Sequence, residues 1–236
     1  EMTSSLVGSE MCIRDRDIIM IVYHGSNKII EKPLYGFGKK YNDYGLGFYC
    51  TESKELAKEW ACDKIHDGYA NAYRLNISDL KVLDLNSDNY NVLNWLSILL
   101  KNRTFNCDTD MEISAKRFLE THYSVDIDQY DVIRGYRADD SYFRFAEDFL
   151  SNTISIEKLE EAMHLGRLGE QIVLKSKKAF DNIEYIKQKS EYADSNIYYA
   201  KKNKRDEQAR SNYKRIKTDI FQGTFIRDII REGGNI

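Results

Sequence analysis

Two short stretches in the first quarter of the chain combine glycine, aromatic and histidine residues at spacings that suit ligand binding. Residues 23–26 are Tyr-His-Gly-Ser, and residues 44–51 are Tyr-Gly-Leu-Gly-Phe-Tyr-Cys-Thr. Glycines allow the backbone to approach a ligand closely, and the rings of Tyr49 and Trp60 could hold a flat ring between them. A second interpretation stays open, in which Tyr49 and Trp60 only pack a helix onto a sheet.

The elements that must position these residues follow from the hydrophobic pattern. A strand over residues 21–23 would place His24 at its end, and a short strand over residues 48–50 follows the two glycines. A helix from about Ser53 to Ile65 carries Trp60 on its apolar face. Further strands are expected over residues 70–77, 81–85, 130–133, 171–174 and 183–189, and further helices within residues 90–123, from Asp139 or Asp140 to Phe149, over residues 156–165 and along the tail from Asp194.

The composition is that of a soluble globular protein with one core. The chain has 236 residues, of which 42% are hydrophobic and 31% are charged, and its net charge is −3. No apolar run approaches the roughly 18 residues that span a bilayer, so we expect no membrane partner. Four cysteines (Cys12, Cys50, Cys62 and Cys107) show no CxxC pairing and no histidine at ligand spacing. This pattern predicts free thiols, no metal site and a cytoplasmic location.

Three segments are expected along the chain. The first residues resemble the translation of an adapter used in sequencing libraries, so we expect residues 1–19 to be non-native and the protein to begin near Met20. Residues 20–193 then form one domain, and residues 194–236 form a charged helical extension. Residues 200–217 hold eight basic and two acidic residues, which suits a solvated amphipathic helix or, alternatively, a surface for nucleic acid.

Five motifs stand in order between Ile21 and Arg231. They are Tyr23-His24-Gly25-Ser26, Gly47-Phe48-Tyr49-Cys50-Thr51, Ala57-Lys58-Glu59-Trp60-Ala61, Arg134-Gly135-Tyr136-Arg137-Ala138-Asp139-Asp140 and Leu168-Gly169-Glu170-Gln171-Ile172-Val173-Leu174-Lys175-Ser176. Their order resembles the ADP-ribosyltransferase superfamily, in the branch that contains the poly(ADP-ribose) polymerases and diphtheria toxin. The chain departs from this branch at Trp60, where the branch usually has a second tyrosine. It most nearly resembles a bacterial family of unknown function that is assigned to this superfamily.

The resemblance implies an α+β fold with an ADP-ribosyltransferase-like split β-sheet core and flanking helices. It also implies a reaction in which the bond between nicotinamide and ribose in NAD is cleaved and ADP-ribose passes to an acceptor. His24 would hydrogen-bond the ribose as part of the catalytic site. The backbone of Gly25 would hold the nicotinamide amide, with a further contact from the Ser26 hydroxyl. Tyr49 and Trp60 would stack on the nicotinamide ring.

The third catalytic position is open between two neighbouring residues. Glu170 and Gln171 both stand at the start of a predicted strand, and only one of them can point into the cleft because successive strand residues face opposite sides. The similar bacterial family usually has glutamine there, which favours Gln171. A glutamine keeps a hydrogen bond to the ribose but lacks the charge that stabilises an oxocarbenium-like transition state. Alternatively, Glu170 is a solvated charge and Gln171 is an amide at the strand edge.

The predicted function is mono-ADP-ribosylation of an acceptor that the sequence does not identify, whether a protein, a nucleic acid or a small molecule. Arg137 suits a phosphate of NAD, because a guanidinium can pair with phosphate in a bidentate manner. Asp140 could position the acceptor or cap a helix. Two other functions would use the same cleft: hydrolysis of NAD with water as the acceptor, and binding of NAD or ADP-ribose without catalysis.

Overall fold

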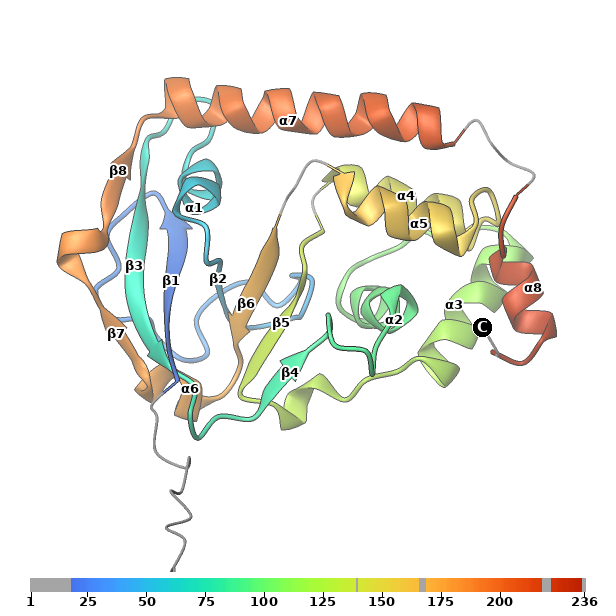
Figure 1. Cartoon of the computed structure of the whole chain (residues 1–236), viewed down its shortest axis with the longest axis horizontal. Coiled ribbons are helices and arrows are strands. Elements are labelled where there is room, and N and C mark those ends of the chain that lie inside the picture. The colour runs from blue at the N-terminus through green and yellow to red at the C-terminus, as the bar shows by residue number, and fades with distance from the viewer. Residues whose placement is uncertain (1–17, 139, 166–168, 218–221, 235–236) are drawn as a thin grey trace, which may run out of the picture.

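The computed structural model describes residues 18–138, 140–165, 169–217 and 222–234 (Figure 1). Both helices and strands are present, so the predicted mixed α+β class is confirmed. Nearly all of the segment expected to be non-native, including Cys12, lies outside the described residues, as does Asp139. None of the helices in the described ranges combines the length and apolarity needed to cross a bilayer.

The strands of the described part form two four-stranded sheets. In the first sheet the order is β1-β3-β7, and β8 also pairs with β3; the bounds are β1 (Ile19–Ser26), β3 (Gly68–Asn76), β7 (Ile183–Tyr185) and β8 (Glu191–Ala193). In the second sheet the order is β2-β6-β5-β4, with bounds β2 (Phe48–Cys50), β6 (Glu170–Leu174), β5 (Val132–Tyr136) and β4 (Val82–Asp84). The pairs are antiparallel except β4 with β5, which run parallel.

The two sheets meet where β1 passes the end of β2. The amide of Tyr23 donates to the carbonyl of Thr51 at 2.7 Å, and the amide of Thr51 donates back at 2.9 Å. Alternate residues of both sheets bury their side chains in one shared core, because strand residues alternate between two faces. This core contains Val22, Phe48, Cys50, Tyr73, Leu75, Ile172 and Leu174.

A second, larger core separates the second sheet from a group of helices, which lies to the right in Figure 1. The helices of this group are α2 (Val92–Asn102), α3 (Asp110–His122), α4 (Asp140–Leu150), α5 (Ile156–Met163) and α8 (Ile226–Arg231). Capping boxes begin two of them: Asn91 with Asn94 at α2, and Thr109 with Glu112 at α3. Each box satisfies backbone amides that the first turn of a helix leaves without partners.

Helix α1 (Lys54–Ala61) packs on β1 and β3 and carries Trp60. Ser53 is its N-cap, with the side-chain oxygen accepting from the amide of Leu56. The prediction that this helix continues to Ile65 is wrong. The Asp63 carboxylate accepts from the backbone amides of Ile65 and His66, both at 2.8 Å, and this local turn competes with the helix.

The strand predicted over residues 183–189 is also shorter than expected. It ends at Tyr185, and residues 187–189 form a 3₁₀ turn that leads into β8. The turn begins where the amide of Ile186 donates to the carbonyl of Ala72 at 2.8 Å. Strand β8 was not predicted, because three residues are too short for an alternating pattern to be recognised.

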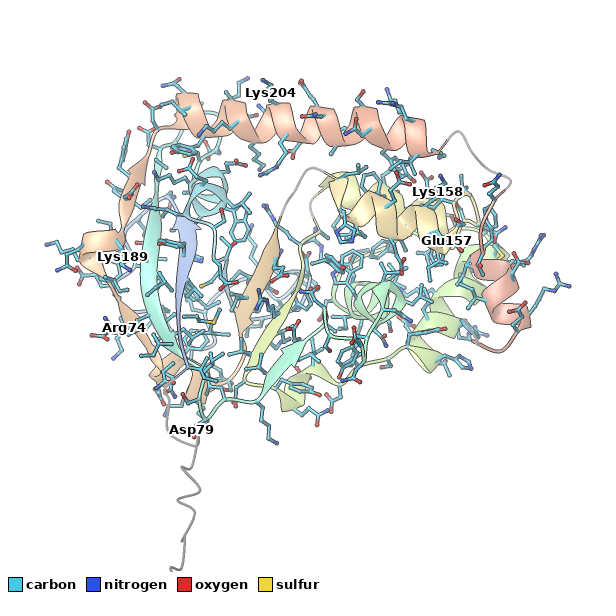
Figure 2. The ribbon with its side chains drawn as sticks, in the orientation of Figure 1. Arg74, Asp79, Glu157, Lys158, Lys189 and Lys204 are labelled. Atoms are coloured by element: carbon cyan, nitrogen blue, oxygen red, sulfur yellow. The ribbon has the colours of Figure 1, made fainter. Side chains whose placement is uncertain are left out.

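The charged tail forms helix α7 (Ser195–Ile216), as predicted, after the short helix α6 (Lys177–Asp181). In Figure 1, α7 runs along the top of the molecule, from the first sheet to the helical group. The hydroxyl of Tyr198 contacts Lys58 on α1 at 3.2 Å, and that of Tyr213 donates to Asp148 on α4 at 2.8 Å. Lys204 lies on the outer side of the helix and is exposed (Figure 2).

Candidate functional site

A cleft of about 920 Å³ opens beside the junction of the two sheets. Its walls come from the end of β1, from β2, α1 and β6, and from the loop of residues 28–47. Of the eight residues expected to bind NAD or to take part in catalysis, seven line the cleft: His24, Gly25, Ser26, Tyr49, Trp60, Arg137 and Gln171. The fold therefore brings together residues that lie far apart in the sequence.

His24 is held by the backbone of the neighbouring strand. Its Nδ1 atom lies 2.7 Å from the carbonyl oxygen of Tyr49, and its ring stacks on that of Phe48 with 4.2 Å between centroids. A carbonyl oxygen can only accept, so Nδ1 carries the proton. Burial lowers the pKa of His24, and this effect outweighs the hydrogen bond to Tyr49, which raises the pKa. The net shift favours the neutral ring. In that tautomer, Nε2 is a hydrogen-bond acceptor.

Gly25 combines a close helix contact with a backbone that is turned away from β3. A Cβ atom at this position would lie 2.1 Å from the carbonyl oxygen of Ala57, so α1 can pack here only against glycine. Two residues earlier, Tyr23 exchanges its backbone hydrogen bonds with Thr51. The backbone amide and carbonyl groups of successive strand residues point to opposite sides of the strand. Those of Gly25 therefore point to the same side as those of Tyr23. Gly25 also lines the cleft.

Tyr49 is fixed by the glycine-rich loop that precedes it. Its hydroxyl donates to the carbonyl of Gly45 at 2.6 Å and accepts from the amide of Tyr44 at 3.1 Å. Gly45 has a φ of +71°, a left-handed conformation that glycine adopts at little cost. Burial raises the pKa of Tyr49, so the hydroxyl stays protonated and keeps both bonds. The half-buried ring of Tyr49 is thereby held against the cleft.

One face of the Trp60 ring is in contact with a charged side chain and is not free to stack on a ligand. The guanidinium carbon of Arg137 lies over its ring at 4.5 Å from the centroid, a cation–π geometry. The indole Nε1 is buried and has no hydrogen-bond partner among the described residues. Since Arg137 covers one face of the indole, only the other face could stack on a ligand ring.

The structure separates the two candidates for the third catalytic position. Gln171 is 5% exposed and lines the cleft, where its Nε2 donates to Asp43 at 3.0 Å. Glu170 faces the other side of β6, where it pairs with Arg134 and accepts from Asn86 at 2.9 Å. Strand alternation thus directs Gln171 inward and Glu170 outward. In this arrangement Glu170 does not contribute to the cleft.

Asp43 belongs to the site although the sequence pattern marked it only as part of a loop. Asp43 is 4% exposed and lines the cleft, as Gln171 does. Its Oδ2 atom accepts from the amide of Ala138 at 2.9 Å, and its Oδ1 atom lies 3.4 Å from a guanidinium nitrogen of Arg103. Burial raises the pKa of Asp43, while these donors and Gln171 act in the opposite direction. No local signal could have identified this residue, because Gln171 lies 128 positions away.

The charges around the cleft favour an anionic ligand. Its lining contains five basic and two acidic side chains: Lys28, Lys32, Lys39, Arg103 and Arg137, against Glu31 and Asp43. A cleft with an excess of one sign of charge concentrates ligands of the opposite sign. Among the described residues, no three histidine, cysteine or acidic side chains are grouped to hold a metal ion.

Comparison with models of protein families matches residues 20–185 to a family described as "Protein of unknown function (DUF3990)". The match covers more than half of the chain. The chain belongs to the DUF3990 family. Searches of curated proteins and of solved structures gave no significant match.

The DUF3990 region contains every residue of the candidate site, from His24 to Gln171. It ends at the last residue of β7, so β8 and α7 lie beyond the matched range. Two basic residues of α7, and Lys217 directly after it, form ion pairs with acidic residues within that range. The pairs are Lys201 with Glu55, Arg205 with Glu59, and Lys217 with Asp148. These contacts of the helix are therefore made with the DUF3990 region itself.

Proposed function

We propose that this DUF3990 protein binds NAD in the cleft, cleaves the bond between nicotinamide and ribose, and transfers ADP-ribose to an acceptor. The observation that carries the proposal is the convergence of His24, Gly25, Tyr49 and Gln171 on one cleft. Each contributes a different kind of contact, and the four come from both sheets. Together with the order of the motifs, this convergence supports an ADP-ribosyltransferase-like core.

The nicotinamide end suits the part of the cleft next to β1. A carboxamide has both donor and acceptor groups, which complement the amide and carbonyl that Gly25 directs away from β3. The Ser26 hydroxyl lines the same end and could add a hydrogen bond to the carboxamide. The ring of Tyr49, held in place by its two hydrogen bonds to the loop, offers a surface for stacking.

The ribose and phosphates suit the remaining part of the lining. Each ribose hydroxyl is a hydrogen-bond donor. Two residues that line the cleft have an acceptor atom that is not used in the hydrogen bonds described above: Nε2 of His24 and Oε1 of Gln171. Arg137, held on the ring of Trp60, and the other basic side chains of the lining would balance the charge of the diphosphate.

In the proposed reaction, the glycosidic C–N bond breaks and its electron pair leaves with the nicotinamide ring, which becomes neutral. Positive charge develops on the ribose, and a nucleophile of the acceptor forms a bond to the same carbon and gives up its proton. The dipole of the Gln171 carbonyl can stabilise this charge, less strongly than a carboxylate would. With water as the nucleophile, the same steps would hydrolyse NAD.

One observation also favours a second candidate, a module that binds NAD or ADP-ribose without turning it over. The cleft residue on β6 is the neutral Gln171, and the neighbouring carboxylate, Glu170, is engaged with Arg134 outside the cleft. Without a charged group at that position, ligand binding could persist while bond cleavage is slow.

The experiment is to measure nicotinamide release from NAD by the wild-type protein and by Gln171→Ala and Glu170→Ala. We expect release by the wild type, a loss of at least about tenfold with Gln171→Ala, which corresponds to about 1.4 kcal/mol, and little change with Glu170→Ala, the matched control outside the cleft. Binding without release would favour the silent module. If the wild type neither binds NAD nor releases nicotinamide, the proposal is refuted. NAD labelled in its adenine half separates transfer, which attaches the label covalently, from hydrolysis.

A further inference from the structure

The carboxylate of Asp43 contacts a donor group on each side. Its Oδ2 atom accepts from two N–H groups, the amide of Ala138 at 2.9 Å and the Nε2 of Gln171 at 3.0 Å. Its Oδ1 atom faces the guanidinium of Arg103 at 3.4 Å. Oδ1 makes no hydrogen bond among the described residues, but a proton on it would be held against the Arg103 cation, so the arrangement fits the ionised form of Asp43.

An ionised carboxylate decides which way round the Gln171 amide lies. Oxygen and nitrogen of a glutamine amide are similar in shape, and only their hydrogen bonds distinguish them. Asp43 can only accept, so Gln171 must turn its NH₂ group to Asp43. This leaves its oxygen, Oε1, on the other side of the amide, in a side chain that lines the cleft. The reverse orientation would bring two acceptors together.

The oxygen that results is an acceptor without a partner. Oε1 of Gln171 is buried and makes no hydrogen bond within the described part of the chain. Gln171 as a residue is 5% exposed, so water reaches it poorly. Buried acceptors are nearly always satisfied, and leaving one unsatisfied is destabilising. A ligand that donates a hydrogen bond would satisfy it.

We propose that Asp43 is a positioning residue that fixes the Gln171 amide with its oxygen toward the cleft, so that the site selects a ligand with a hydroxyl donor such as the ribose diol of NAD. We assign this effect of Asp43 to its contact with Gln171. A hydrogen bond to a charged partner also polarises the amide, which makes Oε1 a stronger acceptor. The negative charge of Asp43 thus lies directly next to the neutral Gln171 amide. The identity of the ligand rests on the proposed function, whereas the orientation of the amide does not.

The test compares NAD affinity, measured by calorimetry on the full chain, for the wild type, Asp43→Asn, Gln171→Glu and Asp43→Asn/Gln171→Glu. Asp43→Asn should weaken binding about tenfold, as expected for one lost hydrogen bond of this kind, because an amide at position 43 can both donate and accept and no longer dictates the orientation of Gln171. Gln171→Glu should also weaken binding, since it sets two carboxylates against each other.

The exchange variant, Asp43→Asn/Gln171→Glu, should restore the affinity to within about threefold of the wild type, a difference of less than about 1 kcal/mol. A carboxylate at position 171 offers an oxygen to the cleft in either orientation, and an amide at position 43 can donate to it. A merely structural role of Asp43 would not be rescued in this way. Affinity of Asp43→Asn within about twofold of the wild type, or an exchange variant that binds no better than Asp43→Asn, would overturn the inference.

A second measurement keeps the inference testable if NAD does not bind at all, an outcome that would refute the proposed function alone. The side-chain NH₂ signals of Gln171 can be assigned in a ¹⁵N-correlated NMR spectrum by their absence in Gln171→Ala. We expect one proton to be shifted downfield and protected from exchange in the wild type, and to lose both properties in Asp43→Asn. Identical Gln171 signals in the two proteins would show that Asp43 does not orient the amide.

Discussion

The Nδ1 atom of His24 donates to the main-chain carbonyl of Tyr49 over 2.7 Å, so two residues that line the cleft are bonded to each other. His24 lies on β1 and Tyr49 on β2, and the nearby residues Tyr23 and Thr51 exchange backbone hydrogen bonds. The histidine is therefore part of the junction between the two sheets as well as part of the cleft. Its protonation should affect both the stability of the fold and the binding of a ligand.

The first prediction concerns the pH dependence of stability. We expect the free energy of unfolding of the wild type to decrease as the pH falls below about 6.5, more steeply than that of His24→Gln. Burial lowers the pKa of His24 below its ordinary value of 6.5, so the unfolded chain binds the proton first and protonation favours unfolding. Well above that pH the ring is neutral in both states, and the pH dependence from His24 vanishes.

Urea unfolding of both proteins between about pH 8 and pH 5 measures this difference. The difference in the free energy of unfolding between wild type and variant should be constant at the alkaline end of this range and should become smaller toward the acidic end. Parallel curves over the whole range would mean that His24 is not held neutral in the folded protein.

The second prediction separates the hydroxyl of Tyr49 from its ring. Tyr49→Phe should lower the free energy of unfolding by about 1–2 kcal/mol, because the carbonyl of Gly45 and the amide of Tyr44 each lose a partner. The ring remains, so NAD binding should persist in Tyr49→Phe and disappear in Tyr49→Ala. Tyr41→Phe is the matched control, since this tyrosine of the same loop is 76% exposed. Equal stability of the two phenylalanine variants would contradict the assigned hydrogen bonds.

Much of the fold follows from the sequence because its signals are local. Alternating and helical hydrophobic patterns predict the central strands and most helices. The errors have local causes of another kind: the turn around Asp63 ends α1 early, and β8 is only three residues long.

The candidate site is less predictable because its decisive contacts join distant parts of the chain. Alternation requires Glu170 and Gln171 to face opposite sides, but the direction of each depends on how β6 pairs with β2 and β5. The contact of Asp43 with Gln171 leaves no trace in either local sequence. The stacking of Arg137 on Trp60 likewise joins residues that are far apart along the chain.

The third prediction uses the two tryptophans as reporters. Trp60 lines the cleft, whereas Trp95 is 1% exposed in the core of the helical group. NAD should therefore quench the emission of the wild type, and the response should be absent in Trp60→Phe, which retains Trp95. Free tryptophan titrated with NAD in parallel corrects for absorption by the ligand. A response of the same size in Trp60→Phe would place the ligand away from Trp60.

The fourth prediction concerns the attachment of α7 to the rest of the molecule. Arg205 pairs with Glu59 on α1, and the two side chains are only 14% and 11% exposed. Arg205→Gln should lower the free energy of unfolding by about 3 kcal/mol, because it leaves the Glu59 carboxylate buried without this cation. Lys204→Gln is the matched control, since the neighbouring Lys204 points outward from α7 (Figure 2) and should change stability by less than about 0.5 kcal/mol.

Urea unfolding of these two variants beside the wild type tests the role of the helix. Glu59 adjoins Trp60, whose ring carries Arg137, and burial raises the pKa of Glu59 while Arg205 and Arg137 oppose this effect. Loss of Arg205 should therefore also weaken NAD binding. Without Arg205, Arg137 is the guanidinium that still attracts the Glu59 carboxylate, and this attraction should move Arg137 away from the cleft. If Arg205→Gln is as stable as Lys204→Gln and binds NAD with unchanged affinity, the pair of Arg205 and Glu59 neither stabilises the DUF3990 region nor influences its cleft.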